Sequence, residues 1–353
     1  MSKNKVKVGI IGAGAIGAVH ADAYAASSEA EIAAICDVSE ARLAEIGNKY
    51  QIRQRFKDYR DLLKSDVEAV SICVGNVLHR EVAVAALKAG KHILLEKPMA
   101  MNAAEAAEIV KAGKRAKKII QIGMVRRQMQ EAKTVRDYVA RGMFGEIYHM
   151  RAVLIRRRGI PGLGGWFTTR AASGGGPLID LGVHWFDAAM HLSGLWKPTG
   201  VSAMNYAAFG RDMRNYRYVS MWAGPPKYDG ICDVEDYSAG LVRFGKKASL
   251  VFEIAWAANT EDAAFIDILG DRGGARLFSG QPLNIYTEHN GQVANISPLI
   301  KSNNMFHDQA AVFVKACLGK CPPAATAEEG LTVMKLIDAV YASAEKGREI
   351  AIN

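Results

Sequence analysis

Cysteine is scarce in this chain of 353 residues, and its spacing argues against two kinds of site. The five cysteines are scattered, odd in number and never arranged as CxxC, so we expect neither a metal site nor a disulfide framework. Long apolar runs are also missing, since no segment approaches the ~18 residues of a membrane span. The N-terminal MSKNKVKV shows no signal-peptide core. We therefore expect a cytoplasmic protein that does not enter a membrane.

Dense blocks of a single charge are absent as well, although the formal net charge is +9. The basic excess is spread evenly and forms no basic tail or helical stripe, so nucleic acid is not an expected partner. The one dense cluster, Arg156-Arg157-Arg158, is either a solvated strand end or a region that attracts an anionic or polyhydroxylated substrate. A chain of this length exceeds one ordinary core, so two domains are expected.

The most informative segment that is present is the glycine-rich stretch that follows the apolar run Val6–Ile11. It reads Gly12-Ala13-Gly14-Ala15-Ile16-Gly17, and Asp37 closes a second apolar run twenty residues later. This order predicts a dinucleotide site: a tight turn, close approach to a pyrophosphate, and a helix packed on its strand. The first N–H groups of that helix, including those of Ala15 and Ile16, would hold the phosphates. A carboxylate at Asp37 favours NAD over NADP, because it accepts hydrogen bonds from ribose hydroxyls and repels a 2′-phosphate.

The first third of the chain alternates between short apolar runs and helical stretches, which predicts a parallel sheet covered on both faces. The expected strands are Val6–Ile11, Ile32–Cys36, Ala69–Val74, His92–Leu95 and Ile119–Ile122. The expected helices are Ala18–Ala26, Glu40–Tyr50, Glu81–Ala89 and Ala103–Lys117. We therefore predict an NAD-binding Rossmann domain over residues 1–124.

The pattern changes in residues 125–353, where we predict an α/β domain for substrate binding and oligomerisation. The period-two alternation of Leu250, Phe252 and Ile254 is typical of an open, largely antiparallel sheet. The expected strands are Ile147–Ile155, Tyr237–Phe244, Ser249–Trp256, Phe265–Leu269 and Ile350–Ile352. The expected helices are Ala132–Arg141, Leu178–Leu192, Phe306–Leu318 and Glu328–Ser343. Because an open sheet commonly pairs with a copy of itself, we expect a homodimer or homotetramer.

Two constellations beyond the glycine turn carry chemistry. Glu96-Lys97-Pro98 follows a strand of the parallel sheet, and ligands of such sheets bind outside the carboxyl ends of the strands. The Lys97 ammonium is therefore a candidate to stabilise an alkoxide as a hydride leaves. Asp180 and His184 lie four residues apart on an apolar helix that follows Gly174-Gly175-Gly176. A carboxylate beside an imidazole tunes it toward general-base work near neutral pH.

These segments resemble the Gfo/Idh/MocA family of sugar and cyclitol oxidoreductases. The resemblance rests on GAGAIG with Asp37, on Val70–Pro98 and on GGGPLIDLGVHWFD, and it extends through DVEDYSAGLVRF to the C-terminal helix. It implies NAD(P)-dependent oxidation of a ring secondary hydroxyl, or reduction of the ketone, with Lys97, Asp180 and His184 as the catalytic residues. Further contacts to the cofactor are implied for Val74, Gly75, Asn76, His79, Glu96, Lys97 and Met124.

The sequence thus predicts an NAD-dependent dehydrogenase of a sugar, glycoside or inositol. Lys97 and His184 are expected to meet at one hydroxyl, with the roles of base and alkoxide stabiliser open between them. Candidates for holding the polyol are Arg156, Arg158, Trp166 and Asp187, although Trp166 is equally explained as a loop anchor. Two alternatives remain: a redox-neutral enzyme that cleaves or epimerises a glycoside with retained NAD, and a non-catalytic regulator that senses NAD or a sugar.

Overall fold

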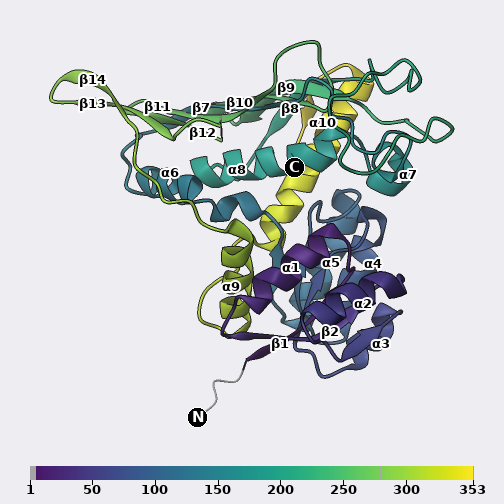
Figure 1. Ribbon diagram of the computed structural model, residues 1–353. Helices are drawn as coiled ribbons and strands as arrows, with labels where there is room; N and C mark the ends of the chain where they lie inside the picture. Colours follow the sequence, from purple (N-terminus) through teal and green to yellow (C-terminus); the bar gives the residue numbers. More distant parts are fainter. Residues whose placement is uncertain (1–4, 279, 353) are drawn as a thin grey trace. The chain divides into compact units, whose positions relative to one another are not determined.

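The computed structural model describes residues 5–278 and 280–352. The chain forms two compact units: Met1–Met129 with Asn303–Leu331, and Gln130–Ser302 with Thr332–Asn353. Figure 1 labels the helices and strands of both units. Within the described ranges, no helix combines the length and the apolar character needed to span a membrane.

The first unit is built on a six-stranded parallel sheet in the order β3-β2-β1-β4-β5-β6. Its strands are β1 (Val6–Ile11), β2 (Ala30–Cys36), β3 (Gln54–Phe56), β4 (Ala69–Ile72), β5 (His92–Leu95) and β6 (Ile120–Ile122). Residues of β1, β4 and β5 are buried almost throughout, as expected for strands with helices on both faces. The strand order reverses between β1 and β4, and such a switch point is where doubly wound sheets bind their ligands.

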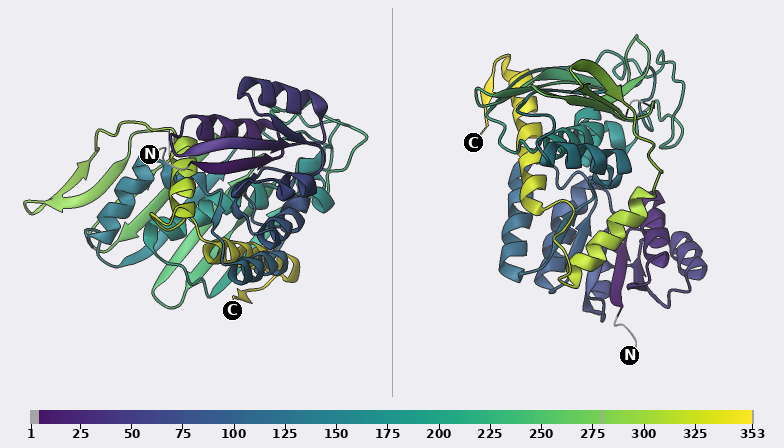
Figure 2. Two further views of the ribbon diagram at one scale, coloured as in Figure 1. Left: turned by 90° about the horizontal axis from the view of Figure 1, so that it is seen from below. Right: turned by 90° about the vertical axis from the view of Figure 1, so that its left-hand side faces the viewer.

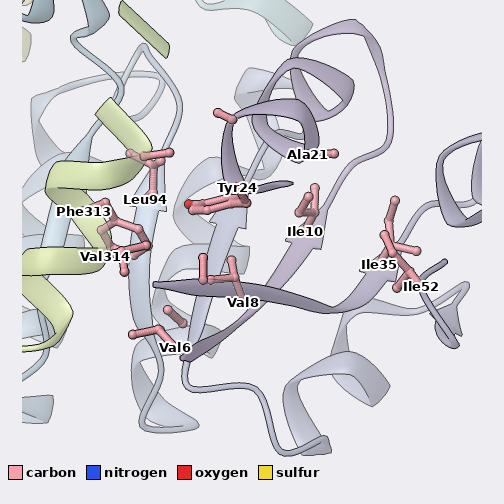
Figure 3. Packing of buried hydrophobic residues seen from close by; sticks show 14 of the residues in the cluster. Val6, Val8, Ile10, Ala21, Tyr24, Ile35, Ile52, Leu94, Phe313 and Val314 are labelled. Carbon is pink, nitrogen blue, oxygen red and sulfur yellow. The ribbon is translucent and has the colours of Figure 1, made fainter. Parts of the chain in front are cut away.

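The helices of this unit confirm the expected alternation, with one addition from the end of the chain. They are α1 (Ala15–Ala25), α2 (Glu40–Lys49), α3 (Tyr59–Lys64), α4 (His79–Lys88), α5 (Ala103–Ala116) and α9 (Met305–Cys317). Phe313 and Val314 of α9 lie in the same buried cluster as Tyr24 and Leu94 (Figure 3). Residues 303–331 therefore complete the first unit, whereas the sequence analysis places them in the second domain.

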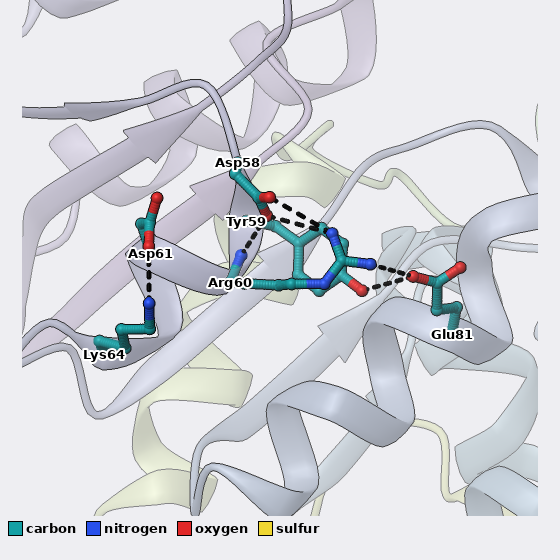
Figure 4. Close-up of polar contacts among 6 residues, drawn as sticks. All are labelled: Asp58, Tyr59, Arg60, Asp61, Lys64 and Glu81. Carbon is teal, nitrogen blue, oxygen red and sulfur yellow. Dashed lines mark hydrogen bonds and ion pairs between the residues drawn. The ribbon is translucent and has the colours of Figure 1, made fainter.

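The helix α3 and the strand β3 are short elements that the apolar periodicity did not indicate. Asp58 caps α3 by accepting a hydrogen bond from the backbone N–H of Arg60 at 2.8 Å. The Arg60 guanidinium and the Tyr59 hydroxyl both donate to Glu81 of α4, at 2.9 and 2.6 Å (Figure 4). These exposed contacts join two neighbouring helices at the surface, and each is worth little in stability.

The second unit contains a nine-stranded sheet in the order β14-β13-β12-β11-β7-β10-β9-β8-β15. Only the β7–β10 pair is parallel, so the expectation of an open, largely antiparallel sheet is confirmed. The strands are β7 (Ile147–Ile155), β8 (Gly200–Tyr206), β9 (Tyr237–Phe244), β10 (Ala248–Ala255), β11 (Ala263–Gly270), β12 (Gly274–Leu277), β13 (Asn284–His289), β14 (Gln292–Ile296) and β15 (Ile350–Ala351).

Two helices of the second unit, α6 (Gln130–Ala140) and α8 (Val183–Ser193), pack on one face of this sheet (Figure 2). The unit also contains α7 (Arg170–Ser173) and the part of α10 (Ala327–Lys346) that follows Leu331. Phe186 of α8 meets Phe252 of β10 edge to face at 4.9 Å, and the Trp185 indole N–H donates to the Val153 carbonyl at 2.8 Å. The sheet thus fixes α8, the helix that carries His184.

Candidate active site

The glycine turn after β1 has the backbone form that a dinucleotide fingerprint requires. Gly12 has φ +96°, and a Cβ there would strike the backbone carbonyl of Cys73. A Cβ at Gly17 would collide with the Gly12 carbonyl oxygen, so only glycine lets α1 pack this closely on β1. Gly14 is the N-cap of α1, and no described side chain caps the first turn that begins at Ala15 and Ile16. This helix end therefore suits an anionic pyrophosphate.

Asp37 follows β2 at the same edge of the sheet, and the structure gives its carboxylate a fixed orientation. One oxygen accepts a hydrogen bond from the Ala13 N–H at 2.7 Å, and the other accepts one from the Ser39 N–H at 2.8 Å. The side chain of Arg42 lies beside Gly14, where its Nη1 would be 3.6 Å from an added Cβ. An anchored, half-buried carboxylate beside the glycine turn fits the ribose of NAD.

Lys97 follows β5 at the edge of the sheet where Gly12 and Asp37 lie, and its peptide bond to Pro98 is cis. Its neighbour Glu96 points inward instead: it is buried, and its Oε1 lies 2.9 Å from the Nε2 of His20 on α1. Glu96 is also among the residues predicted to contact the cofactor. His20 was not singled out in the sequence. Its signal is an ionisable residue on the buried face of α1.

The remaining cofactor candidates lie on the segments after β4 and β6. Val74 is half-buried, Gly75 is exposed, and Asn76 and Met124 are buried. His79 is buried as well, with Nδ1 2.6 Å from the Pro98 carbonyl and Nε2 3.0 Å from the Val74 carbonyl. Burial lowers the pKa of His79, although both carbonyl contacts favour the charged ring. This buried histidine therefore links the segment that follows β4 to the segment that follows β5.

In the second unit, Asp180 and His184 lie on one continuous helical stretch that contains an unusual turn. Residues Leu178–Gly182 form η4, a single turn of π-helix, and α8 continues from Val183. Turns of π-helix are rare in proteins, and many of those that occur lie at functional sites. Asp180 is buried, and its Oδ2 accepts a hydrogen bond from the indole N–H of Trp256 at 3.2 Å. Trp256 was expected only as the end of a strand, because its partner is 76 residues away in sequence.

The glycine loop before η4 is held by Glu235, a buried residue that the sequence analysis does not single out. Its Oε1 accepts hydrogen bonds from the N–H groups of Gly176 and Leu178, at 3.0 and 3.2 Å, and from the Tyr341 hydroxyl at 2.9 Å. A Cβ at Gly175 would strike the Tyr341 hydroxyl, and one at Gly176 would strike the Glu235 carbonyl. The loop therefore needs both glycines to reach the carboxylate that fixes it.

Glu235 should leave a pH-dependent signature in stability. Burial raises its pKa above the ordinary 4.5, so the folded protein binds this proton more tightly than the unfolded chain. The free energy of unfolding should therefore fall as pH rises from 4.5 through the raised value. Glu235→Gln keeps an acceptor oxygen but cannot ionise, so its stability relative to wild type should increase with pH over that window. Urea unfolding between pH 4.5 and 8 measures this difference. Glu345→Gln, at an exposed glutamate of α10, is the control, and a pH-independent difference for Glu235→Gln would contradict the assignment.

The candidate substrate residues have different environments within the second unit. Trp166 is 45% exposed and stacks on Phe167, with ring centroids 3.8 Å apart. Arg158 is engaged locally: it donates to the Ala258 carbonyl at 3.0 Å, and its guanidinium lies over the Phe209 ring. Arg156 is half-buried, and Asp187 is 1% exposed. Trp166 therefore has the side chain most available to a ligand among these four.

Comparison with known proteins agrees with this picture over the whole chain. Residues 6–124 match the NAD-binding Rossmann-fold domain of the Gfo/Idh/MocA oxidoreductase family, and residues 132–276 match its C-terminal domain. The chain is 32% identical over 359 residues to a D-glucoside 3-dehydrogenase of Escherichia coli K12, covering 100% of this chain and 99% of that protein.

Solved structures share the fold at lower identity. An oxidoreductase domain protein from Kribbella flavida superposes with a TM-score of 0.87 at 24% identity, covering 99% of this chain and 100% of that one. A levoglucosan dehydrogenase in complex with NADH gives a TM-score of 0.85 at 22% identity, with coverage of 99% and 100%. With both domains matched and a relative aligned along its full length, this chain belongs to the Gfo/Idh/MocA family of NAD-binding oxidoreductases.

Proposed function

We propose that this protein oxidises a secondary hydroxyl on the ring of a sugar, glycoside or inositol with NAD, or reduces the corresponding ketone. The observation that carries the proposal is the placement of Lys97 at the same edge of the parallel sheet as the glycine turn and Asp37. The full-length similarity to a D-glucoside 3-dehydrogenase makes a glucoside the first substrate to test.

The cofactor residues in this proposal are those around the switch point of the first sheet. The N–H groups at the start of α1 bind the pyrophosphate, and the Asp37 carboxylate accepts hydrogen bonds from the adenosine ribose. Val74, Gly75, Asn76 and Met124 line the nicotinamide half. NAD, when bound, supplies the acceptor for the hydride that leaves the substrate carbon. Glu96 and His79 support this region through their buried contacts with His20 and with the Pro98 carbonyl.

The protein groups manage the proton and the developing charge on oxygen. Lys97 hydrogen-bonds the substrate hydroxyl and stabilises the alkoxide, and His184 removes the proton, with their roles exchangeable. Asp180 orients His184, and the Trp256 indole holds the Asp180 carboxylate through its hydrogen bond. The π-helical turn η4 sets the spacing of these side chains along the helix.

On the substrate side, we assign Trp166 as the aromatic surface for a pyranose ring, because it is the exposed member of the candidate set. Arg156, Arg158 and Asp187 are assigned to support this region. The Arg158 guanidinium contacts the Ala258 carbonyl and the Phe209 ring, and it supports the region through these contacts.

We also propose a cytoplasmic homodimer or homotetramer assembled through the larger sheet. The support is the sheet face turned away from α8. There the guanidinium groups of Arg151 and Arg276 both lie over the Phe265 ring, 5.1 and 4.3 Å from its centroid. Asp267 binds Arg276 with both oxygens, at 2.6 and 2.7 Å, which keeps both charged groups flat on the sheet. A face of this kind suits a second copy of the chain.

The test is NADH formation with a panel of methyl glucosides, levoglucosan, free aldoses and inositols. We expect turnover with NAD on at least one glucoside or cyclitol and much weaker turnover with NADP. If every panel member fails in both directions while NADH binds tightly, the dehydrogenase proposal is wrong. Cleavage of a glycoside without release of NADH would instead identify the redox-neutral alternative.

A further inference from the structure

A continuous chain of buried polar groups runs beneath the glycine turn of the first unit. The Tyr24 hydroxyl lies 2.7 Å from the Ser71 hydroxyl, which lies 3.1 Å from Nδ1 of His20. Nε2 of His20 lies 2.9 Å from Oε1 of Glu96. The His20 and Glu96 side chains are only 2% and 9% exposed. The chain therefore links the dinucleotide helix α1, through β4, to the end of β5.

The Glu96 end of this chain leads directly to Lys97. Oε2 of Glu96 accepts a hydrogen bond from the Lys97 backbone N–H at 3.3 Å. The carboxylate is also enclosed, because a Cβ at Gly123 would lie 2.6 Å from its Oε1. Glu96 thus has one oxygen on His20 and the other on the main chain from which the Lys97 side chain extends.

A second histidine holds the same turn from its other side. His79 of α4 contacts the Pro98 carbonyl at 2.6 Å, one residue beyond Lys97. The residue before Lys97 and the residue after it are therefore each held by a buried imidazole. Lys97 itself is half-buried between these two anchors.

Stability alone does not explain why the His20 and Glu96 side chains are buried together. Removing two charges from water costs several kcal/mol per ion, and well-packed apolar replacements are often neutral or stabilising. Burial lowers the pKa of His20, but its contacts with Cys73 and Glu96 outweigh burial and raise it to about 10. Burial raises the pKa of Glu96, but the His20 hydrogen bond and charge hold it below 4.5. The pair is therefore ionised at neutral pH, and its geometric effect is to fix one carboxylate.

We propose that His20 is a positioning residue for Lys97 and acts through the Glu96 carboxylate. His20 fixes Glu96, and Glu96 fixes the backbone at Lys97, so the ammonium is delivered to the same point in every turnover. This inference rests on the role of Lys97 proposed above. It predicts that His20 affects the chemical step more than it affects cofactor binding.

Four variants separate this role from simple packing. His20→Leu fills the space but cannot donate to Glu96, whereas His20→Gln keeps a side-chain N–H for it. Glu96→Gln tests the other partner. Tyr24→Phe is the matched control, because it removes only the far hydroxyl of the same buried chain.

We expect His20→Leu to lower kcat by ~10–10²-fold, the usual effect of misplacing a catalytic group, with little change in the Kd for NADH. His20→Gln should recover part of the loss, and Tyr24→Phe should leave kcat near wild type. In the protein without cofactor, amide exchange of the peptide spanning Lys97 should quicken by about tenfold in His20→Leu, the effect of losing one hydrogen bond to a charged group. His20→Leu and Glu96→Gln should be non-additive, since they break one interaction.

Unchanged kcat and unchanged exchange at Lys97 in His20→Leu would overturn the proposal. Equal losses in kcat and NADH affinity for all three His20 and Glu96 variants would also overturn it, because they indicate general damage to the fold. If His20→Leu does not fold, His20→Gln and Glu96→Gln carry the same comparison. If wild type oxidises no panel substrate, the proposed function fails, and the exchange measurement alone decides the role of His20.

Discussion

Replacing Lys97 with methionine is expected to lower kcat by ~10²–10⁴-fold, the contribution of one well-placed acid–base group. Methionine keeps most of the side-chain volume, so the turn between Glu96 and cis-Pro98 should persist. The Kd for NADH, measured by fluorescence titration, should change little because the pyrophosphate and ribose contacts remain. His184→Ala should give a loss of similar size, since the proposal makes it the partner in the same proton transfer.

Lys111→Met is the matched control, because it removes an exposed lysine from α5 of the same unit. A pH profile of kcat/KM adds a second test: the limb that reports the general base should disappear in the variant that lacks it. Near-wild-type turnover by both Lys97→Met and His184→Ala would remove these residues from the mechanism, whatever substrate the enzyme prefers.

Replacing Asp37 with serine is expected to shift cofactor preference toward NADP. The value of kcat/KM for NADP, divided by the value for NAD, should rise by ~10²-fold or more, since close like charges cost several kcal/mol. The carboxylate that would repel a 2′-phosphate is lost, and the nearby Arg42 guanidinium remains beside Gly14 to attract it. Activity with NAD should fall as well, because the ribose loses an ionised hydrogen-bond acceptor.

Asp37→Asn separates charge from shape in this experiment. Its amide oxygen still accepts one backbone N–H, from Ala13 or Ser39, while the negative charge is gone. If charge is the main cause of NAD preference, the asparagine variant should also gain activity with NADP. An unaltered cofactor ratio in both variants would show that Asp37 does not contact the ribose.

The sequence predicts the first unit well because each signal there is local. The edges of β1 and β5 follow from short apolar runs, and the glycine turn is followed by its helix within a few residues. The bounds of the long strands β7 and β9 are predicted with the same precision, and Gly245 marks the end of β9. The sequence does not predict short elements such as β3 and α3, since three or six residues are too few to show a hydrophobic periodicity.

The supporting residues of the candidate site were harder to predict, because their partners are distant in sequence. His20 pairs with a glutamate 76 residues away, and Asp180 with an indole equally far along the chain. Glu235 lies within a segment that resembles the family, but only the fold shows that it clamps the glycine loop before η4. Residue type and spacing thus indicate the groups proposed for chemistry, while the residues that hold them depend on tertiary packing.

Helix α9 comes late in the sequence but belongs to the first unit, and this arrangement has a consequence for biosynthesis. Val6 and Leu94 share a buried cluster with Phe313 and Val314, which leave the ribosome more than two hundred residues after Leu94 (Figure 3). Until then, the nascent Rossmann sheet carries an apolar face that its own N-terminal sequence cannot cover, a state that favours chaperone binding. The cofactor domain is therefore finished only after residues 303–331 have been synthesised, and cutting the gene at the first domain boundary would not yield a self-sufficient nucleotide-binding fragment.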